Sequence, residues 1–139
     1  MVAIKQVPKV EEIALDENGR MIRKGVELQT NPFCRRAITK AVEIARESEG
    51  SVTAVAMGPL SASQVIREAL AVGVDEGYLI CDPAMAGSDT LVTARVLERF
   101  ISVFGPFSLV LLGRFSIDAG TGQVGPQLAE LLGVPFAGA

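Results

Sequence analysis

A β-α-β pattern is clearest in residues 52–81, which read VTAVAMGPLSASQVIREALAVGVDEGYLIC. The run 52–57 is apolar, rich in β-branched residues and closed by a Gly-Pro pair, which predicts a buried strand. Apolar residues then recur at helical spacing over 61–73, and 77–81 is a second apolar run. A strand, a helix and a strand in this order predict parallel strands joined by a right-handed crossover.

The same alternation continues on both sides of this unit. We expect further strands and helices at residues 2–7, 33–48, 88–103, 107–112 and 123–132. The first of these runs is closed by a proline and is expected to lie mid-sheet. Because the strands are almost continuously apolar, both of their faces must be covered. The fold class is therefore predicted to be α/β, a Rossmann-like parallel sheet with helices on both faces.

Two shorter segments stand outside this alternation. The sequence Asp16-Glu17-Asn18-Gly19 lies between two short stretches in residues 13–26, and Asn-Gly supplies the positive φ angles of a tight turn. A small N-terminal surface hairpin is therefore expected. Residues 134–139 resemble the first half of a further strand, so another element is expected to begin there.

The composition is that of a globular protein. With 139 residues, 49% of them hydrophobic, the chain is predicted to form one domain over 1–139. Its apolar runs are too short to cross a bilayer, so membrane insertion is not expected. No secretory signal is visible, so we expect a cytoplasmic location. A net charge of −3 without a basic stripe argues against a nucleic-acid partner.

Cysteine and histidine usage limits the chemistry. Cys34 and Cys81 are the two cysteines, they form no CxxC pair, and the chain has no histidine. Both are expected to be reduced thiols, and no metal site is expected. Ser-His-Asp and Cys-His catalysis are excluded, so we assign no catalytic residue and expect a cofactor to carry any reaction.

The strongest candidate site is the loop of residues 113–126, which joins a predicted strand to a predicted helix. Ligands of open α/β sheets bind at the carboxyl ends of the strands, and free N–H groups at a helix start hold anions. Gly120, Gly122 and Gly125 spell a GxGxxG motif, but it lies too far from its strand for a dinucleotide fingerprint. The loop is therefore either a phosphate site or a glycine-rich turn.

Several positions outside this loop have either two interpretations or a purely structural one. Asn31 either caps the helix that follows it or bonds a purine edge. The glycine after Met57 either leaves room for a flat ring or simply ends a strand. Residues 88–90 read as an N-cap cluster. Lys5 and Arg114 either pair with phosphates or are solvated charges at strand ends.

Taken together, these segments resemble the electron-transfer flavoprotein beta subunit family, and the resemblance covers the whole chain. It rests on seven features in order: Lys5-Gln6-Val7-Pro8, the hairpin, Asn31-Pro32-Phe33, Met57-Gly58-Pro59, residues 67–75, Ser88-Asp89-Thr90 and the loop 113–126. The resemblance implies a fold of the adenine-nucleotide alpha-hydrolase-like superfamily. It also implies an electron-carrier subunit, more than a stand-alone enzyme, paired with an alpha subunit that carries the electron-transferring FAD.

The resemblance also implies a nucleotide pocket. In this family the beta subunit holds AMP in one branch and a second FAD in the electron-bifurcating branch. Carried over by position, the cofactor-binding residues are Ala3, Asn31, Phe33, Cys34, Met57, Asp118, Thr121, Gly122, Gln123 and Val124. The backbone N–H groups of the last three are expected to hold phosphate.

Residues in the pocket point to both ligands. The sequence Gln123-Val124-Gly125-Pro126 resembles the FAD-holding branch, whereas Cys34 resembles members that hold AMP. Gly120 and Gly122 replace the acidic and small residues usual in the flavin branch. We expect FAD, with AMP as the alternative.

Family members continue for about another domain's length, roughly 100–200 residues. In that family, the resemblance implies, the second half includes the segment that docks partner dehydrogenases and the arm that embraces the alpha subunit, and the 139 residues of this chain resemble only the first half. The expected partners are an alpha subunit in a heterodimer, a dehydrogenase or quinone reductase, and a second copy if a sheet edge is unpaired. The alternative function is an adenine-nucleotide sensor or structural module without redox activity.

Overall fold

The computed structural model of the chain describes residues 1–9, 14–15, 17, 21–22 and 27–138. Its main sheet has four parallel strands in the order β7-β6-β1-β8. These strands are Glu76–Ile80 (β7), Thr53–Met57 (β6), Val2–Ile4 (β1) and Leu111–Leu112 (β8). The predicted α/β fold with a parallel sheet is confirmed, and β1 lies inside the sheet as expected.

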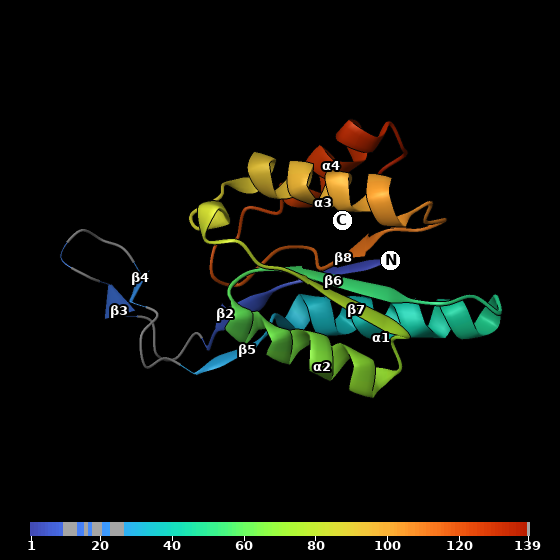
Figure 1. Cartoon of the computed structure of the whole chain (residues 1–139), viewed down its shortest axis with the longest axis horizontal. Helices are drawn as coiled ribbons and strands as arrows, with labels where there is room; N and C mark the ends of the chain where they lie inside the picture. Colours follow the sequence, from blue (N-terminus) through green and yellow to red (C-terminus); the bar gives the residue numbers. More distant parts are fainter. Residues whose placement is uncertain (10–13, 16, 18–20, 23–26, 139) are drawn as a thin grey trace.

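Helices cover both faces of this sheet (Figure 1). One face carries α1 (Pro32–Glu47) and α2 (Ser63–Val72), and the other carries α3 (Thr90–Phe104) and α4 (Val124–Leu132). Short 3-10 turns, η2 (Leu60–Ala62) and η3 (Pro83–Met85), lie before α2 and α3. The helices on both faces are thus confirmed.

The helix ends follow local chemistry. Proline fits the first turn of α1 because that turn's N–H groups lack helical partners in any case. The Asp89 carboxylate accepts a hydrogen bond from the N–H of Val92 at 2.8 Å, so the predicted N-cap cluster before α3 is confirmed. Gly73 and Gly133 end α2 and α4 in the left-handed conformation, with φ of 119° and 63°.

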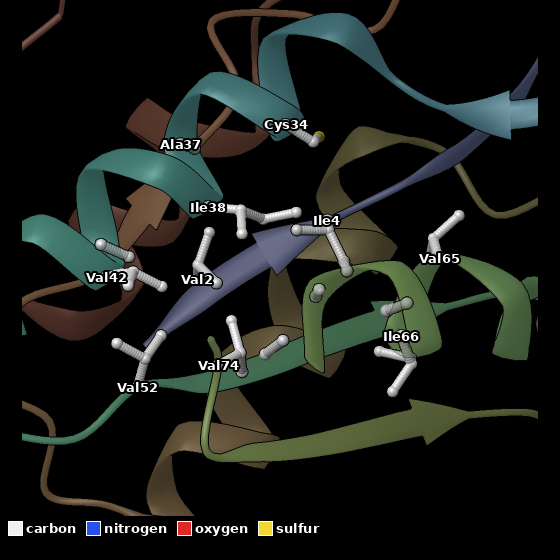
Figure 2. Packing of buried hydrophobic residues seen from close by; sticks show 14 residues of the cluster. Val2, Ile4, Cys34, Ala37, Ile38, Val42, Val52, Val65, Ile66 and Val74 are labelled. Atoms are coloured by element: carbon white, nitrogen blue, oxygen red, sulfur yellow. The ribbon is translucent and has the colours of Figure 1, made fainter. Parts of the chain in front are cut away.

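Alternation along the strands sends side chains into two cores. Val2 and Ile4 point into the cluster beneath α1 and α2, which also contains Ile38 of α1 (Figure 2). Ala3 and Val55 point the other way, into the cluster under α3 and α4. Burying an Ile or Val side chain of this kind contributes roughly 1.5–3 kcal/mol. The burial of side chains on both faces therefore stabilises the sheet.

The run 2–7 is predicted as one mid-sheet strand, but the structure divides it at Lys5 into two strands, and only the first lies in the main sheet. After Lys5 the chain leaves the main sheet, and Gln6–Pro8 (β2) pairs antiparallel with Leu28–Thr30 (β5) in a separate two-stranded sheet. Pro8 ends β2, where its missing N–H is tolerated because the ribbon has no further strand on that side among the described residues. The apolar pattern over 2–7 is continuous, but the strand partner changes from β6 and β8 to β5.

The predicted strand 107–112 is wrong over 107–110. β8 is a sheet edge paired only with β1, and its ladder is limited to Val2 and Ala3. Phe107 and Val110 instead pack against the cluster under α3 and α4. Over 107–110 the apolar pattern therefore reflects the packing of Phe107 and Val110 under α3 and α4, while Leu109 is exposed.

The expected hairpin is confirmed by the antiparallel pairing of Ala14–Leu15 (β3) with Met21–Ile22 (β4). The proposed turn at Asn18-Gly19 lies outside the described residues. The strand expected from residue 134 is wrong over 134–138, which form no strand. A Cβ on Gly125 would lie 3.1 Å from the Phe136 ring, so this segment lies back against the start of α4.

No helix within the described ranges is long and apolar enough to cross a lipid bilayer.

Candidate functional site

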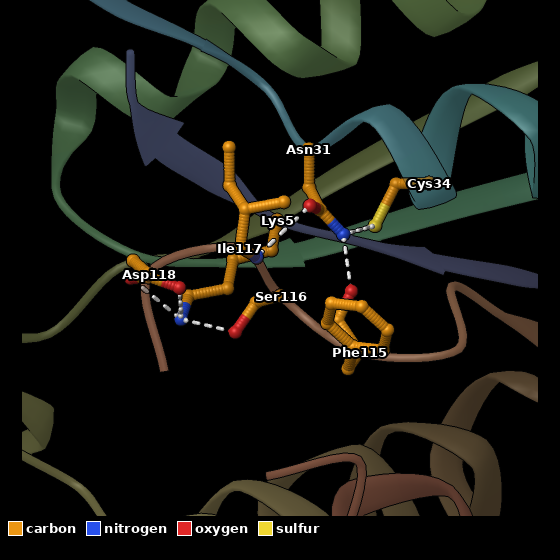
Figure 3. A network of polar contacts seen from close by, with 7 residues as sticks. All are labelled: Lys5, Asn31, Cys34, Phe115, Ser116, Ile117 and Asp118. Carbon is orange, nitrogen blue, oxygen red and sulfur yellow. Dashed lines mark hydrogen bonds and ion pairs between the residues drawn. The ribbon is translucent and has the colours of Figure 1, made fainter. Parts of the chain in front are cut away.

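Three segments meet beyond the carboxyl ends of β1 and β8. Lys5 follows β1, Asn31 precedes α1, and the loop 113–123 runs from β8 to α4 (Figure 3). Because β1 and β8 are parallel neighbours, the residues that follow them emerge at the same edge of the sheet. The topology therefore brings together residues more than 100 positions apart.

Asn31 holds the loop through both ends of its side-chain amide. Nδ2 donates to the carbonyl of Phe115 at 2.8 Å and to Sγ of Cys34 at 3.4 Å, and Oδ1 accepts from the N–H of Ile117 at 3.3 Å. The residue is 1% exposed. Its side chain makes no capping bond to α1, so the capping interpretation is wrong, because the amide is turned toward the loop.

Lys5 binds the same loop at Ser116 and Asp118. Its Nζ donates to both carboxylate oxygens of Asp118, at 2.8 and 2.9 Å, and to Oγ of Ser116 at 3.2 Å. The Asp118 side chain is 5% exposed and that of Lys5 43%. Burial by itself raises the pKa of Asp118, but hydrogen bonds from Lys5 and Ser116 and the Lys5 charge outweigh it and hold this pKa below 3.8. Lys5 is therefore a partly exposed charge at the strand end that forms an ion pair with a buried carboxylate.

The beginning of the loop packs directly on the first turn of α1. A Cβ on Gly113 would lie 3.0 Å from both the backbone N of Cys34 and the carbonyl carbon of Phe33. The rings of Phe33 and Phe115 pack with their centroids 4.3 Å apart. The glycine therefore permits a close approach of two backbones.

The second half of the loop is open. Gly120 and Gly122 have φ of 68° and 63°, in the left-handed region, and residues 119–123 are exposed. In the part of the chain that the structure describes, the N–H groups of 122–124 donate to no other protein group. Thr90 Oγ1 contacts Gln123 Oε1 at 3.1 Å, which joins the start of α3 to this end. Free N–H groups at a helix start are the features that bind anions.

Cys34 lies behind this network and is 4% exposed. Burial raises the pKa of its thiol above 9.0, against weaker lowering by hydrogen bonds and by the Lys5 charge. The thiol is therefore protonated at neutral pH and acts as a packing group. Among the described residues, no cluster of Cys, Asp and Glu is large enough to hold a metal ion.

Comparison with known proteins gives the family. Residues 19–138 match the electron transfer flavoprotein domain. The chain belongs to the electron transfer flavoprotein family. The family resemblance read from the sequence is thus confirmed.

The relatives of this electron transfer flavoprotein chain are beta subunits and similar proteins. Electron transfer flavoprotein subunit beta of Thermoanaerobacterium thermosaccharolyticum is 44% identical over 136 residues, which cover 97% of this chain and 52% of that protein. Subunit CarD of the caffeyl-CoA reductase-Etf complex of Acetobacterium woodii is 42% identical, over 97% of this chain and 52% of CarD. Protein FixA of Bradyrhizobium diazoefficiens is 37% identical, over 96% of this chain and 48% of FixA. The chain spans about half the length of the curated relatives it matches.

Within this electron transfer flavoprotein chain, the predicted binding residues fall into three groups. The contact network brings together Asn31, Phe33, Cys34 and Asp118, and the open end of the loop contains Thr121, Gly122, Gln123 and Val124. Ala3 is 8% exposed and packs in the core under α3 and α4. Met57 lies half-buried at the carboxyl end of β6.

Sequence reasoning placed Phe115, Ser116 and Ile117 in the candidate loop but gave them no role of their own. Their backbone or side-chain groups bind Asn31 and Lys5. The available signal was topological. Two neighbouring parallel strands end at one edge, so a lysine after one and an aspartate after the other are natural partners.

Two surface hollows lie away from the loop. One, of about 230 Å³, lies between α1 and α2, and the other lies along the outer face of α1. Both are bordered by long charged side chains such as Arg35, and neither is lined by residues 113–123. The candidate site is therefore defined by the contacts and free N–H groups of the loop.

Proposed function

We propose that this chain is the nucleotide-holding part of an electron-transfer flavoprotein beta subunit, with FAD as the ligand and AMP as the alternative. The observation that carries the proposal is the loop 113–123, which is anchored at one end and has free N–H groups at the other. The names of the relatives support the beta-subunit role. The fit to a nucleotide rests on the arrangement of this loop.

A phosphate would bind at the open end. Gly122, Gln123 and Val124 lie at the start of α4 with N–H groups that bond no described protein group, and a free helix N-terminus contributes roughly 0.3–1 kcal/mol per negative charge and about 2 when partly buried. Asp118 lies four residues before Gly122, and its charge would repel a phosphate. Lys5 pairs with that carboxylate and so removes the net negative charge.

The remaining residues would line and orient the ligand. Phe33 supplies an apolar face, Cys34 and Met57 fill space, and Ala3 keeps the middle of β1 small. Asn31 acts by fixing the loop, since its amide is engaged there. When bound, FAD supplies a flavin ring that accepts and donates electrons, whereas AMP supplies no redox chemistry.

The partners belong to the same proposal. The chain would work in a heterodimer with an alpha subunit that carries FAD, and the pair would exchange electrons with a dehydrogenase or quinone reductase. Two relatives support assembly by their names, the Etf-complex subunit CarD and the acryloyl-CoA reductase electron transfer subunit gamma of Anaerotignum propionicum.

The first test identifies the ligand. The purified chain is examined for flavin absorbance, denatured, and its released nucleotides are separated by chromatography. We expect released FAD, which supports the electron carrier. Release of AMP alone supports the alternative ligand and leaves the redox role to be tested with an alpha subunit. Neither nucleotide, together with no heat of binding on titration with either, would overturn the proposal.

The second test locates the phosphate. Gln123→Pro removes one backbone donor, whereas Gln123→Ala keeps that donor and removes the same side chain. A hydrogen bond to a charged group contributes about 1.5–3 kcal/mol, so calorimetric titration with AMP and FAD should show a loss of roughly ten- to hundredfold in the proline variant only. Asn31→Ala should also weaken binding while the fold remains. Unchanged affinity in Gln123→Pro and Asn31→Ala would mean that the site lies elsewhere.

A further inference from the structure

The Lys5–Asp118 contact connects the first strand to the middle of the loop. Lys5 lies immediately after β1, and its Nζ bonds both carboxylate oxygens of Asp118 as well as Oγ of Ser116. The carboxylate is almost fully buried, so it is held in one place. An ion pair with two short bonds to a buried carboxylate is better ordered than an exposed surface pair.

Together with Asn31, this pair fixes a continuous stretch of the loop. Asn31 binds the backbone at residues 115 and 117, and Lys5 binds side chains at 116 and 118. Each of four consecutive residues is therefore tied to a strand end or helix start (Figure 3). The N–H of Gly120 donates to the carbonyl of Ser116 at 2.7 Å, which carries this constraint toward the open end.

We infer that Lys5 and Asp118 form a positioning pair that sets the direction of the free N–H groups at residues 122–124 toward a phosphate-bearing ligand. The inference rests on the proposed function. Lys5 acts through Asp118 and the loop and does not itself touch the phosphate, because its three bonds are directed at Asp118 and Ser116. Asp118 likewise acts as the partner of Lys5 and not as a ligand contact.

A double-mutant cycle tests this pair by calorimetric titration with AMP and with adenosine. Lys5→Met, Asp118→Asn and the double variant are compared with Lys40→Met, a matched control that breaks the exposed Lys40–Glu43 pair on α1. Each single variant should lower AMP affinity roughly tenfold, and the double variant should be no weaker than the weaker single. Lys5→Arg should retain most of the affinity. Adenosine binding and the control should change little.

Other patterns would overturn the inference. If Lys5 bound the phosphate directly, Asp118→Asn would leave AMP affinity unchanged or raise it. If the pair merely held the fold together, AMP and adenosine would weaken alike. Should the unaltered chain bind neither AMP nor FAD, the proposed function fails, and hydrogen exchange at residues 119–124 then tests the pair alone. Faster exchange there in Lys5→Met than in Lys40→Met supports positioning, and equal exchange refutes it.

Discussion

Helices α1 and α4 both start at the carboxyl edge of the sheet, and their first turns differ in what surrounds them. Neither α1 nor α4 has a capping bond from its N-cap side chain. The start of α1 is closed, because Gly113 presses against its backbone and Asn31 binds the neighbouring loop. The residues just before α4, 119–123, are exposed, and the N–H groups of 122–124 lack partners within the described residues. The comparison indicates that one helix start anchors the loop while the other remains available to an anion.

The largest effect is expected from adding a side chain at Gly113, where the loop contacts the first turn of α1. Gly113→Val places side-chain carbon 3.0 Å from two backbone atoms, so α1 and the loop must separate. We expect a loss of about 3 kcal/mol in the free energy of unfolding, measured by urea denaturation. Gly120→Ala is the control at the open end, where nothing lies within 4 Å and only the positive φ is strained. It should cost about 1 kcal/mol. Equal losses would show that the two ends are packed alike.

A smaller, pH-dependent effect is expected from Asp118. Its pKa in the folded chain lies below the ordinary 3.8, so its ionised form stabilises the fold above that pH. This contribution is lost as pH falls through the lower, folded pKa. The unfolding free energies of the unaltered chain and of Asp118→Asn should therefore differ most near about pH 6 and converge in acid. A difference in unfolding free energy that stays constant with pH would mean that the ion pair does not stabilise the anchored end of the loop.

The repeating elements were predictable because hydrophobic periodicity reports burial. Strand β6, helix α2 and strand β7 lie within about two residues of their expected positions, the accuracy usual for boundaries. The same signal failed at 107–110, where Phe107 and Val110 pack against the cluster under α3 and α4 and the described residues form no strand ladder. Periodicity does not distinguish these two causes.

The candidate site was only partly predictable. The loop 113–126 and the Asn31 segment were recognisable from glycine content, helix starts and family resemblance. The direction of the Asn31 amide was not predictable, because it depends on how closely Gly113 lets the loop approach the first turn of α1. The pairing of Lys5 with Asp118 joins residues 113 positions apart and follows from the β1–β8 register. Local patterns do not contain that register.

The smallest effect concerns reactivity and leaves stability unchanged. Cys34 is buried in the closed end and the pKa of its thiol is raised by burial, whereas Cys81 is exposed. Since the thiolate is the reactive form, a maleimide should label Cys81 rapidly and Cys34 only when the fold opens. Mass spectrometry of digested protein measures both rates, and Cys81→Ser should lose the fast phase. Gly113→Val should speed the labelling of Cys34 and not that of Cys81, because only the first thiol lies under the displaced turn. Rapid labelling of Cys34 in the unaltered chain would show that the first turn of α1 opens as readily as that of α4, which would remove the distinction between the two helix starts.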